Sequence, residues 1–243
     1  MELRQMIFKI LSPKDLANCR LICRQLNNEI REDYMLMRII WSSVPVQRCI
    51  KEALRQGRED PLNMEFFKGL IKFAPDPNPA DVYGRTPLYA AAHAGHSELC
   101  HLILDRCEDK NPAVKGGWTP LHFLAKHGHL ALCRLILRTA QDKNPSCTYG
   151  RTPLHWAANC GHLEVCQLIL AICKDKNPAD ERGLTPLHLA AWSGHKEVCK
   201  LILGQVENKH PRDGQGKTPL DWARNQNKSD VVDLINSFEK TSS

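Results

Sequence analysis

The sequence predicts an all-α solenoid, in which one helical unit is repeated along the chain and each copy packs on the next. The string Gly-x-Thr-Pro-Leu recurs at a constant interval of 33 residues, and so do Leu-Ile-Leu and, except in the last copy, Asn-Pro. A repeat of this length is typical of proteins whose units bury their apolar faces against their neighbours. The glycines that open the recurring strings are Gly84, Gly117, Gly150, Gly183 and Gly216.

The residue pattern within each copy predicts two helices and a turn. In one copy, Thr152 is suited to cap the first helix, and Pro153 occupies the first helical position, where its missing N–H costs nothing. Gly161 ends that helix at a site suited to positive φ. Residues 163–170 then place apolar side chains on one face of a second helix. The Asn177-Pro178 turn leads to the next copy.

The unit resembles the ankyrin repeat. The signature Thr-Pro-Leu-His is present at 119–122, 152–155 and 185–188, and with one change at 86–89 and 218–221. The resemblance implies that the signature imidazole hydrogen-bonds backbone atoms of the turns. It covers about residues 46–238, which comprise a degenerate first unit at 46–83, units at 84–116, 117–149, 150–182 and 183–215, and a polar C-terminal cap at 216–238.

One departure from the ankyrin pattern is systematic. Ankyrin units usually end their second helix with Gly, whereas this chain has other residues there, namely Ala74, Cys107, Ala140, Cys173 and Val206. We therefore expect these helices to end more tightly or one residue later than usual.

Four of the eleven cysteines recur at the repeat interval, on the inner face of the second helix: Cys100, Cys133, Cys166 and Cys199. Equivalent positions on packed helices lie about 10 Å apart. Zinc ligands must all lie within about 2.3 Å of one ion. We therefore expect these cysteines to be small buried hydrophobic residues, and we expect no metal and no cofactor.

The resemblance implies that the turn tips and the exposed side of each first helix form a concave surface that binds a protein partner. The variable positions there are rich in aromatic and basic residues, which are common at binding hot spots. They are Tyr83, Arg85, His93, Trp118, Lys126, His127, Tyr149, Arg151, Asn159, Arg182, Trp192, Gln215 and Lys217. This composition predicts a partner segment with acidic and apolar residues. The alternative is that the aromatic side chains cover repeat edges and bind nothing specific.

Residues 1–45 do not share the period and predict amphipathic helices, one of which begins near Ser12-Pro13. The order of residues between Glu2 and Arg24 resembles the F-box, although Leu26 stands where Trp is common and the opening Leu-Pro would precede Met1. The resemblance implies docking on the adaptor subunit of a cullin-RING ubiquitin ligase. The docking residues would be Ile7, Leu11, Pro13, Leu16 and Ile22. The alternative is that these helices only cap the solenoid.

The composition and the motifs of the chain indicate which classes of function to expect. The net charge of +6 comes without a block of consecutive basic residues, so nucleic acid is not indicated as a partner. No apolar run is long enough to predict a membrane helix, and the odd number of cysteines without an export signal predicts a cytoplasmic or nuclear protein. No nucleophile–base pair or phosphate loop indicates an enzyme. The sequence therefore predicts a non-catalytic, substrate-recruiting F-box subunit of a ubiquitin ligase or, alternatively, a stand-alone ankyrin scaffold or inhibitor.

Overall fold

The computed structural model describes residue 71, residues 76–80 and residues 83–240. These residues belong to two compact units, the second of which begins at Asp109. Throughout the described ranges the regular elements are helices, and none is a strand. This confirms the predicted all-α fold class. No helix in these ranges is both long enough and apolar enough to cross a membrane.

In the first unit, the described part contains α6 (Pro87–Ala94) and α7 (Ser97–Leu104), which pack against each other. The turn before α6 is held by two side chains. Asp76 Oδ1 accepts the backbone N–H of Asn78 at 2.8 Å, and Asn78 Oδ1 accepts the N–H of Leu88 at 2.9 Å. Asn78 thereby satisfies an N–H in the first turn of α6 that has no partner within the helix.

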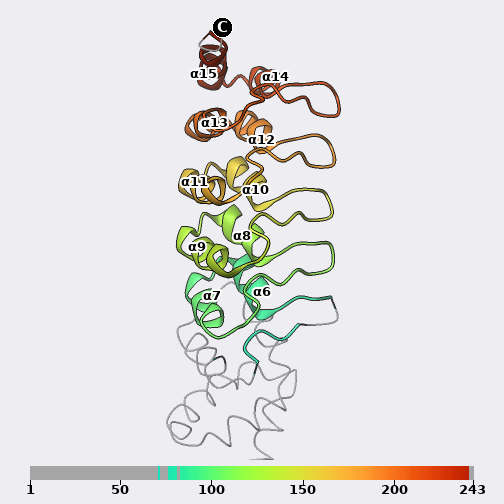
Figure 1. Ribbon diagram of the computed structural model, residues 1–243, viewed down its shortest axis with the longest axis vertical. Coiled ribbons are helices and arrows are strands. Elements are labelled where there is room, and N and C mark those ends of the chain that lie inside the picture. The colour runs from blue at the N-terminus through green and yellow to red at the C-terminus, as the bar shows by residue number, and fades with distance from the viewer. Residues whose placement is uncertain (1–70, 72–75, 81–82, 241–243) are drawn as a thin grey trace, which may run out of the picture. The chain divides into compact units, whose positions relative to one another are not determined.

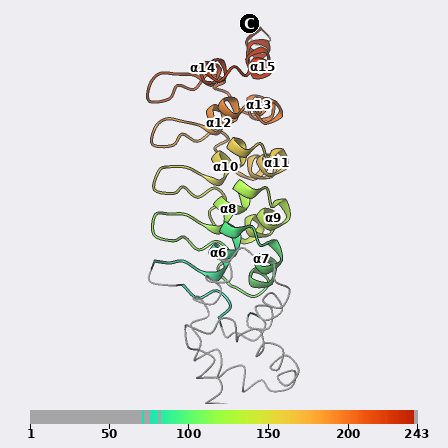
Figure 2. The same ribbon diagram turned by 180° about the vertical axis from the view of Figure 1, so that it is seen from behind.

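The second unit is a stack of four helix pairs. The first and second helices form two columns, and the turns all project from the side of the first helices (Figures 1 and 2). The first helices are α8 (Pro120–His127), α10 (Pro153–Cys160), α12 (Pro186–Ser193) and α14 (Pro219–Asn225). The second helices are α9 (Leu130–Thr139), α11 (Leu163–Ile172), α13 (Lys196–Leu203) and α15 (Ser229–Lys240). Each first helix packs against the next, so α10 lies between α8 and α12.

The ankyrin signature determines where each first helix begins. Thr119 is extended and Pro120 occupies the first helical turn. The Nδ1 atom of His122 accepts the Thr119 backbone N–H at 3.0 Å. His155 and His188 accept from their capping threonines in the same way, at 3.0 and 3.1 Å. Histidine thus takes the place that Glu or Gln has in an ordinary capping box.

The same histidines connect each repeat to the next one. The Nε2 atoms of His122, His155 and His188 lie 3.0–3.1 Å from the carbonyl oxygen of a residue in the next turn. A carbonyl oxygen only accepts, so Nε2 carries the proton and Nδ1 is free to accept. Burial lowers the pKa of His122 and of His155 to about 4. The predicted role of these imidazoles in holding the turns is confirmed.

In the last repeat, Asp221 stands at the position of the signature histidine. One carboxylate oxygen accepts both the backbone N–H of Thr218, at 2.9 Å, and its hydroxyl, at 2.8 Å. A carboxylate caps the helix as an imidazole does but has no N–H to donate to a following turn. The exposed Asp230 and Asp233 on α15 agree with the predicted polar end of the stack.

The four periodic cysteines are fully buried, which confirms their prediction as core residues. Burial raises the pKa of each thiol, and that of Cys133 reaches about 12. Cys107, Cys147 and Cys173 are buried as well, although they lie outside the periodic set. The raised pKa keeps the four periodic thiols protonated, and they are therefore poor nucleophiles.

The second helices end without a left-handed residue. Cys173 donates its N–H to the carbonyl oxygen of Ile169 at 2.9 Å and then leaves the helix in an extended conformation. Ala140 does the same with Ile136 at 2.8 Å. Because an extended conformation allows a β-carbon, the usual glycine is not required there. The helices α9 and α11 have ten residues, whereas α7 and α13 have eight, so the end of the second helix differs from copy to copy.

Candidate functional site

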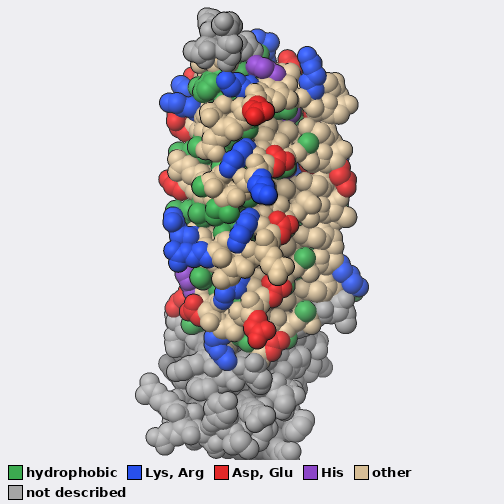
Figure 3. All heavy atoms as spheres, in the orientation of Figure 1, with side chains coloured by type: hydrophobic (Ala, Val, Ile, Leu, Met, Phe, Trp, Pro, Cys, Tyr) green, Lys and Arg blue, Asp and Glu red, His purple; other side chains and the backbone are tan. Residues whose placement is uncertain are grey.

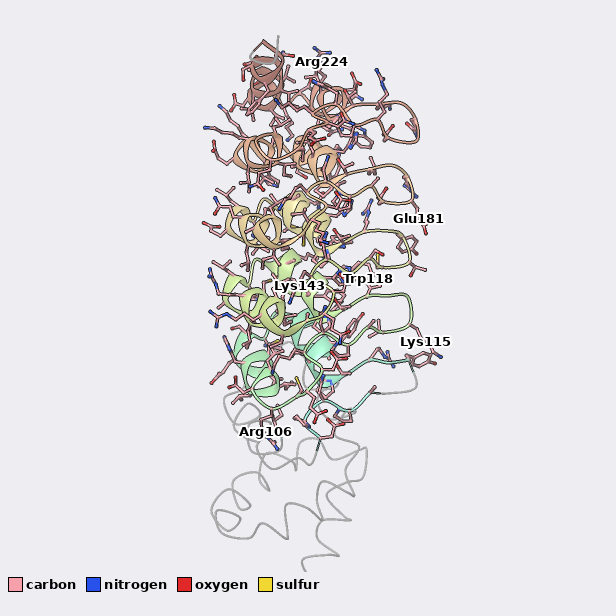
Figure 4. The ribbon with its side chains drawn as sticks, viewed as in Figure 1. Arg106, Lys115, Trp118, Lys143, Glu181 and Arg224 are labelled. Atoms are coloured by element: carbon pink, nitrogen blue, oxygen red, sulfur yellow. The ribbon has the colours of Figure 1, made fainter. Side chains whose placement is uncertain are left out.

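The turns of the second unit are joined tip to tip by backbone hydrogen bonds. Thr148 donates its N–H to Gly116 at 2.8 Å, Glu181 to Tyr149 at 3.1 Å, and Gly214 to Arg182 at 2.7 Å. Figure 4 shows Lys115 and Glu181 at the tips, with Trp118 closer to the helices. These bonds hold the tips at the repeat spacing, so side chains at equivalent tip positions are presented as an ordered row. We call the tips and the first helices of this unit the recognition face.

An aromatic cluster occupies the recognition face between α8 and α10. The ring of Trp118 lies 5.3 Å from the ring of Phe123 and 5.3 Å from that of Trp156, measured between centroids. Phe123 is buried, whereas both tryptophans are half-buried. Pairs at this separation are favourable beyond the apolar area that they bury. Trp118 was predicted to contact a partner, and part of its ring surface is already covered by its own chain.

Two cations lie against the ring of Trp156. Lys126 Nζ and Arg151 Cζ are each 5.6 Å from its centroid, within the range of a cation–π interaction. Arg151 Nε also donates to Asp180 Oδ2 at 3.1 Å. The other oxygen of Asp180 accepts two backbone N–H groups of its own turn. The charge of Arg151 is therefore largely balanced, and that of Lys126 is not balanced by any described acidic residue.

The outer part of the recognition face exposes both apolar and basic groups. Tyr149 is 64% exposed at a turn tip, and Trp192 is 41% exposed on α12. Lys126, His127, Arg182, Gln215 and Lys217 are exposed too. Among the described tip residues Glu181 is an exposed acid, whereas Asp180 and Asp213 are buried. On the side of the molecule that Figure 3 shows, Lys and Arg side chains are interleaved with Asp and Glu side chains, and neither charge forms a continuous patch.

Lys126, Asn159 and Trp192 stand at the same position of three successive first helices, 33 residues apart. Asn159 is bonded through both of its oxygens: its backbone carbonyl oxygen accepts from His195 Nε2 at 3.1 Å, and its side-chain Oδ1 accepts from the Ser193 hydroxyl at 3.4 Å. The amide NH₂ of Asn159 has no acceptor among the described residues. The three side chains therefore form a row of cation, amide donor and aromatic ring.

Three of the predicted partner-binding residues belong to the first unit. Tyr83 is 54% exposed, and the Arg85 guanidinium lies 4.7 Å from its ring centroid. His93 is exposed near the end of α6, with its ring 6.4 Å from that of Tyr89. These residues have the same aromatic and basic character as those of the recognition face.

Trp156 is central to the aromatic cluster and is not among the partner-binding residues that the sequence predicts. The signal was present in the repeat register, because Phe123, Trp156, Leu189 and Trp222 follow the signature directly at the repeat interval. The ring of Trp156 reaches Trp118 in the turn of the preceding copy. Trp222 instead contacts the turn before its own helix: its Nε1 donates to Asp213 Oδ2 at 2.9 Å, and Lys217 Nζ lies 6.0 Å from its ring centroid.

Within the described ranges, no group of three or more His, Cys, Asp or Glu residues is arranged to hold a metal ion. The predicted adaptor-docking residues, Ile7, Leu11, Pro13, Leu16 and Ile22, lie outside the described residues.

Comparison with known families agrees with the repeat geometry. The model of three consecutive ankyrin repeats matches residues 106–180 and 169–242, and that of a single ankyrin repeat matches residues 83–115. The F-box domain model matches residues 1–36. No curated protein matches the chain. Ankyrin repeats and F-box domains are protein-interaction modules and are typically non-catalytic. The chain therefore belongs to the ankyrin-repeat family and carries an F-box domain in its N-terminal segment.

Proposed function

We propose that this protein is the substrate-recruiting F-box subunit of a cullin-RING ubiquitin ligase. The observation that carries the proposal is the combination of an F-box domain, at residues 1–36, with ankyrin repeats in one chain. The F-box binds the adaptor subunit of the ligase, and the recognition face binds the substrate. The protein performs no chemistry itself. It acts by raising the local concentration of the substrate near a ubiquitin-charged enzyme.

The composition of the recognition face supports a protein substrate. Trp192 and Tyr149 are large exposed rings, and such residues bury much area on binding while losing little conformational freedom. Lys126 and Arg182 are exposed cations with no acidic partner among the described residues, and they favour an acidic segment. The cysteines of the described ranges are all free thiols, in keeping with a cytoplasmic or nuclear location.

Binding of the purified ligase adaptor tests the F-box part of the proposal. The full chain should capture the adaptor, and Leu16→Glu should abolish capture, because it places a charge on the predicted apolar docking stripe. Asn18→Glu is the matched control. It adds the same charge two residues later, on the other side of the predicted helix, and should leave capture unchanged.

Capture by both variants, or no capture by the parent chain, would contradict the ligase assignment. In that case the chain acts as an ankyrin scaffold or inhibitor, and substrate binding by the recognition face is unaffected. Measuring adaptor binding and substrate binding separately therefore separates the two functions.

A further inference from the structure

The row formed by Lys126, Asn159 and Trp192 presents three different chemistries along one line. Lys126 offers an exposed cation on α8, and Trp192 offers an exposed aromatic ring on α12. Between them, the side-chain amide of Asn159, whose Oδ1 accepts from the Ser193 hydroxyl, keeps its NH₂ group for a donor bond. A ligand that satisfies all three must carry an anion at one end, an apolar group at the other and a hydrogen-bond acceptor in between. An extended polypeptide has this composition, because its backbone carbonyl oxygens provide the acceptor.

The helix stack sets the spacing between the two ends. The helix α10 packs between α8 and α12, so Lys126 and Trp192 are two helix-packing steps apart. Packed helices lie about 8–10 Å apart, which puts the two positions about 16–20 Å from each other. An extended chain rises about 3.3 Å per residue, so about five or six residues span this distance.

We propose that the recognition face selects an extended protein segment in which an acidic side chain and a large apolar side chain stand about five or six residues apart. The acidic side chain binds Lys126, and the apolar side chain packs on Trp192. A backbone carbonyl between them accepts from the Asn159 amide. The inference rests on the proposed function, because it specifies which segments the substrate-binding face accepts.

Charge complementarity selects this occupant. The Arg151 charge is balanced by Asp180, so it adds little attraction for an anion. Lys126 has no such partner in the described part of the chain, and its ammonium group lies beside the Trp156 ring. A carboxylate bound there is held by a charge-assisted bond next to an apolar ring that excludes water.

Selection of random peptides on the full chain tests the proposal without a known substrate. A displayed library of random peptides is panned on the immobilised protein, and the enriched sequences are read. We expect pairs of one Asp or Glu and one aromatic or large aliphatic residue at the stated separation. Selection on Lys126→Glu should replace the acidic preference with Lys or Arg, and selection on Trp192→Ala should remove the apolar preference. Lys200→Glu, on the exposed surface of α13, is the matched control and should change neither preference.

The most enriched peptide is then synthesised with a fluorescent label, and its affinity is measured by anisotropy. Moving its acidic residue three positions closer to the apolar one should weaken binding about tenfold or more, as should Lys126→Glu. A library without enrichment, or binding indifferent to the separation or to Lys126, would overturn the inference. Binding that still depends on Trp192 but not on the separation would refute the spacing and leave the substrate-binding face in place.

Discussion

Replacing Gly183 with Ala tests the idea that close backbone contact between successive turns stabilises the stack. Gly183 has φ of 74° at the corner of its turn, and Gly216 has φ of 76° at the equivalent corner of the next copy. A β-carbon at Gly183 would lie 2.8 Å from the backbone N of Gly214 and 3.0 Å from two backbone atoms of Asp213. A β-carbon at Gly216 would meet nothing within 4 Å. The two substitutions therefore differ in steric contact and share the left-handed backbone.

The left-handed conformation costs an L-residue about 1–2 kcal/mol, and this cost applies to both variants. Crowding in a packed region adds about 1–3 kcal/mol, and it applies to Gly183→Ala alone. That variant also disturbs the bond from the Gly214 N–H to the Arg182 carbonyl, 2.7 Å long, which is worth about 1 kcal/mol. We expect Gly183→Ala to lose about 2–4 kcal/mol more of the free energy of unfolding than Gly216→Ala.

Urea unfolding followed by far-ultraviolet circular dichroism measures the difference, with Gly216→Ala as the matched control. Amide hydrogen exchange gives a local readout, because the Gly214 N–H should exchange faster in Gly183→Ala. Equal losses of stability in the two variants, with unchanged exchange at Gly214, would refute the idea that the turns are in rigid backbone contact.

Three further predictions concern the buried histidines, the asparagine of the turn and the tryptophans. Burial lowers the pKa of His155 to about 4, against 6.5 when unfolded, so its contribution to stability is complete above pH 6.5 and is lost as pH falls towards 4. Unfolding free energy should drop by about 2 kcal/mol for this histidine between pH 7 and pH 5, and His155→Gln should show a correspondingly flatter pH dependence in thermal melts. Asn144 Oδ1 accepts the N–H of Leu154 at 3.3 Å, so Asn144→Ala should cost about 1 kcal/mol in urea unfolding, and an unchanged midpoint would contradict this role. Trp118→Ala should lower the free energy of unfolding by about 2 kcal/mol, because it removes a stacked, half-buried ring. Trp192→Ala removes an exposed ring and should change the free energy of unfolding by less than about 0.5 kcal/mol. Equal shifts in the thermal melts of the two variants would contradict this distinction.

The positions of the repeats follow from the sequence because each unit is specified by short-range interactions. Gly117 and Gly150 adopt φ of 73° and 71°, and with the other three they occupy equivalent corners, as their spacing predicts. Thr119 and His122 are three residues apart, so the capping pair forms within one helical turn. Cys133 is buried because the period of its helix places it on the inner face.

For the recognition face, the sequence predicted which residues lie on it but not how they pack against one another. The sequence placed Trp118 and Arg151 on the recognition face, since both occupy variable positions of the turn. It did not show that Trp118 stacks on Trp156 or that Asp180 pairs with Arg151. These partners are 38 and 29 residues away along the chain, and the repeat pattern carries no information about them because surface positions vary freely from copy to copy.

By itself, the sequence determined that this protein is built of ankyrin units, where each first helix begins, and which side of each unit faces its neighbours. Glycine corners, threonine caps and helical periodicity are local properties, so they can be read along the chain. Only the tertiary structure decided which exposed groups remain available for a partner. That depends on contacts between copies, which leave the charge of Lys126 without a described acidic partner and the ring of Trp192 exposed while balancing Arg151 and partly covering Trp118.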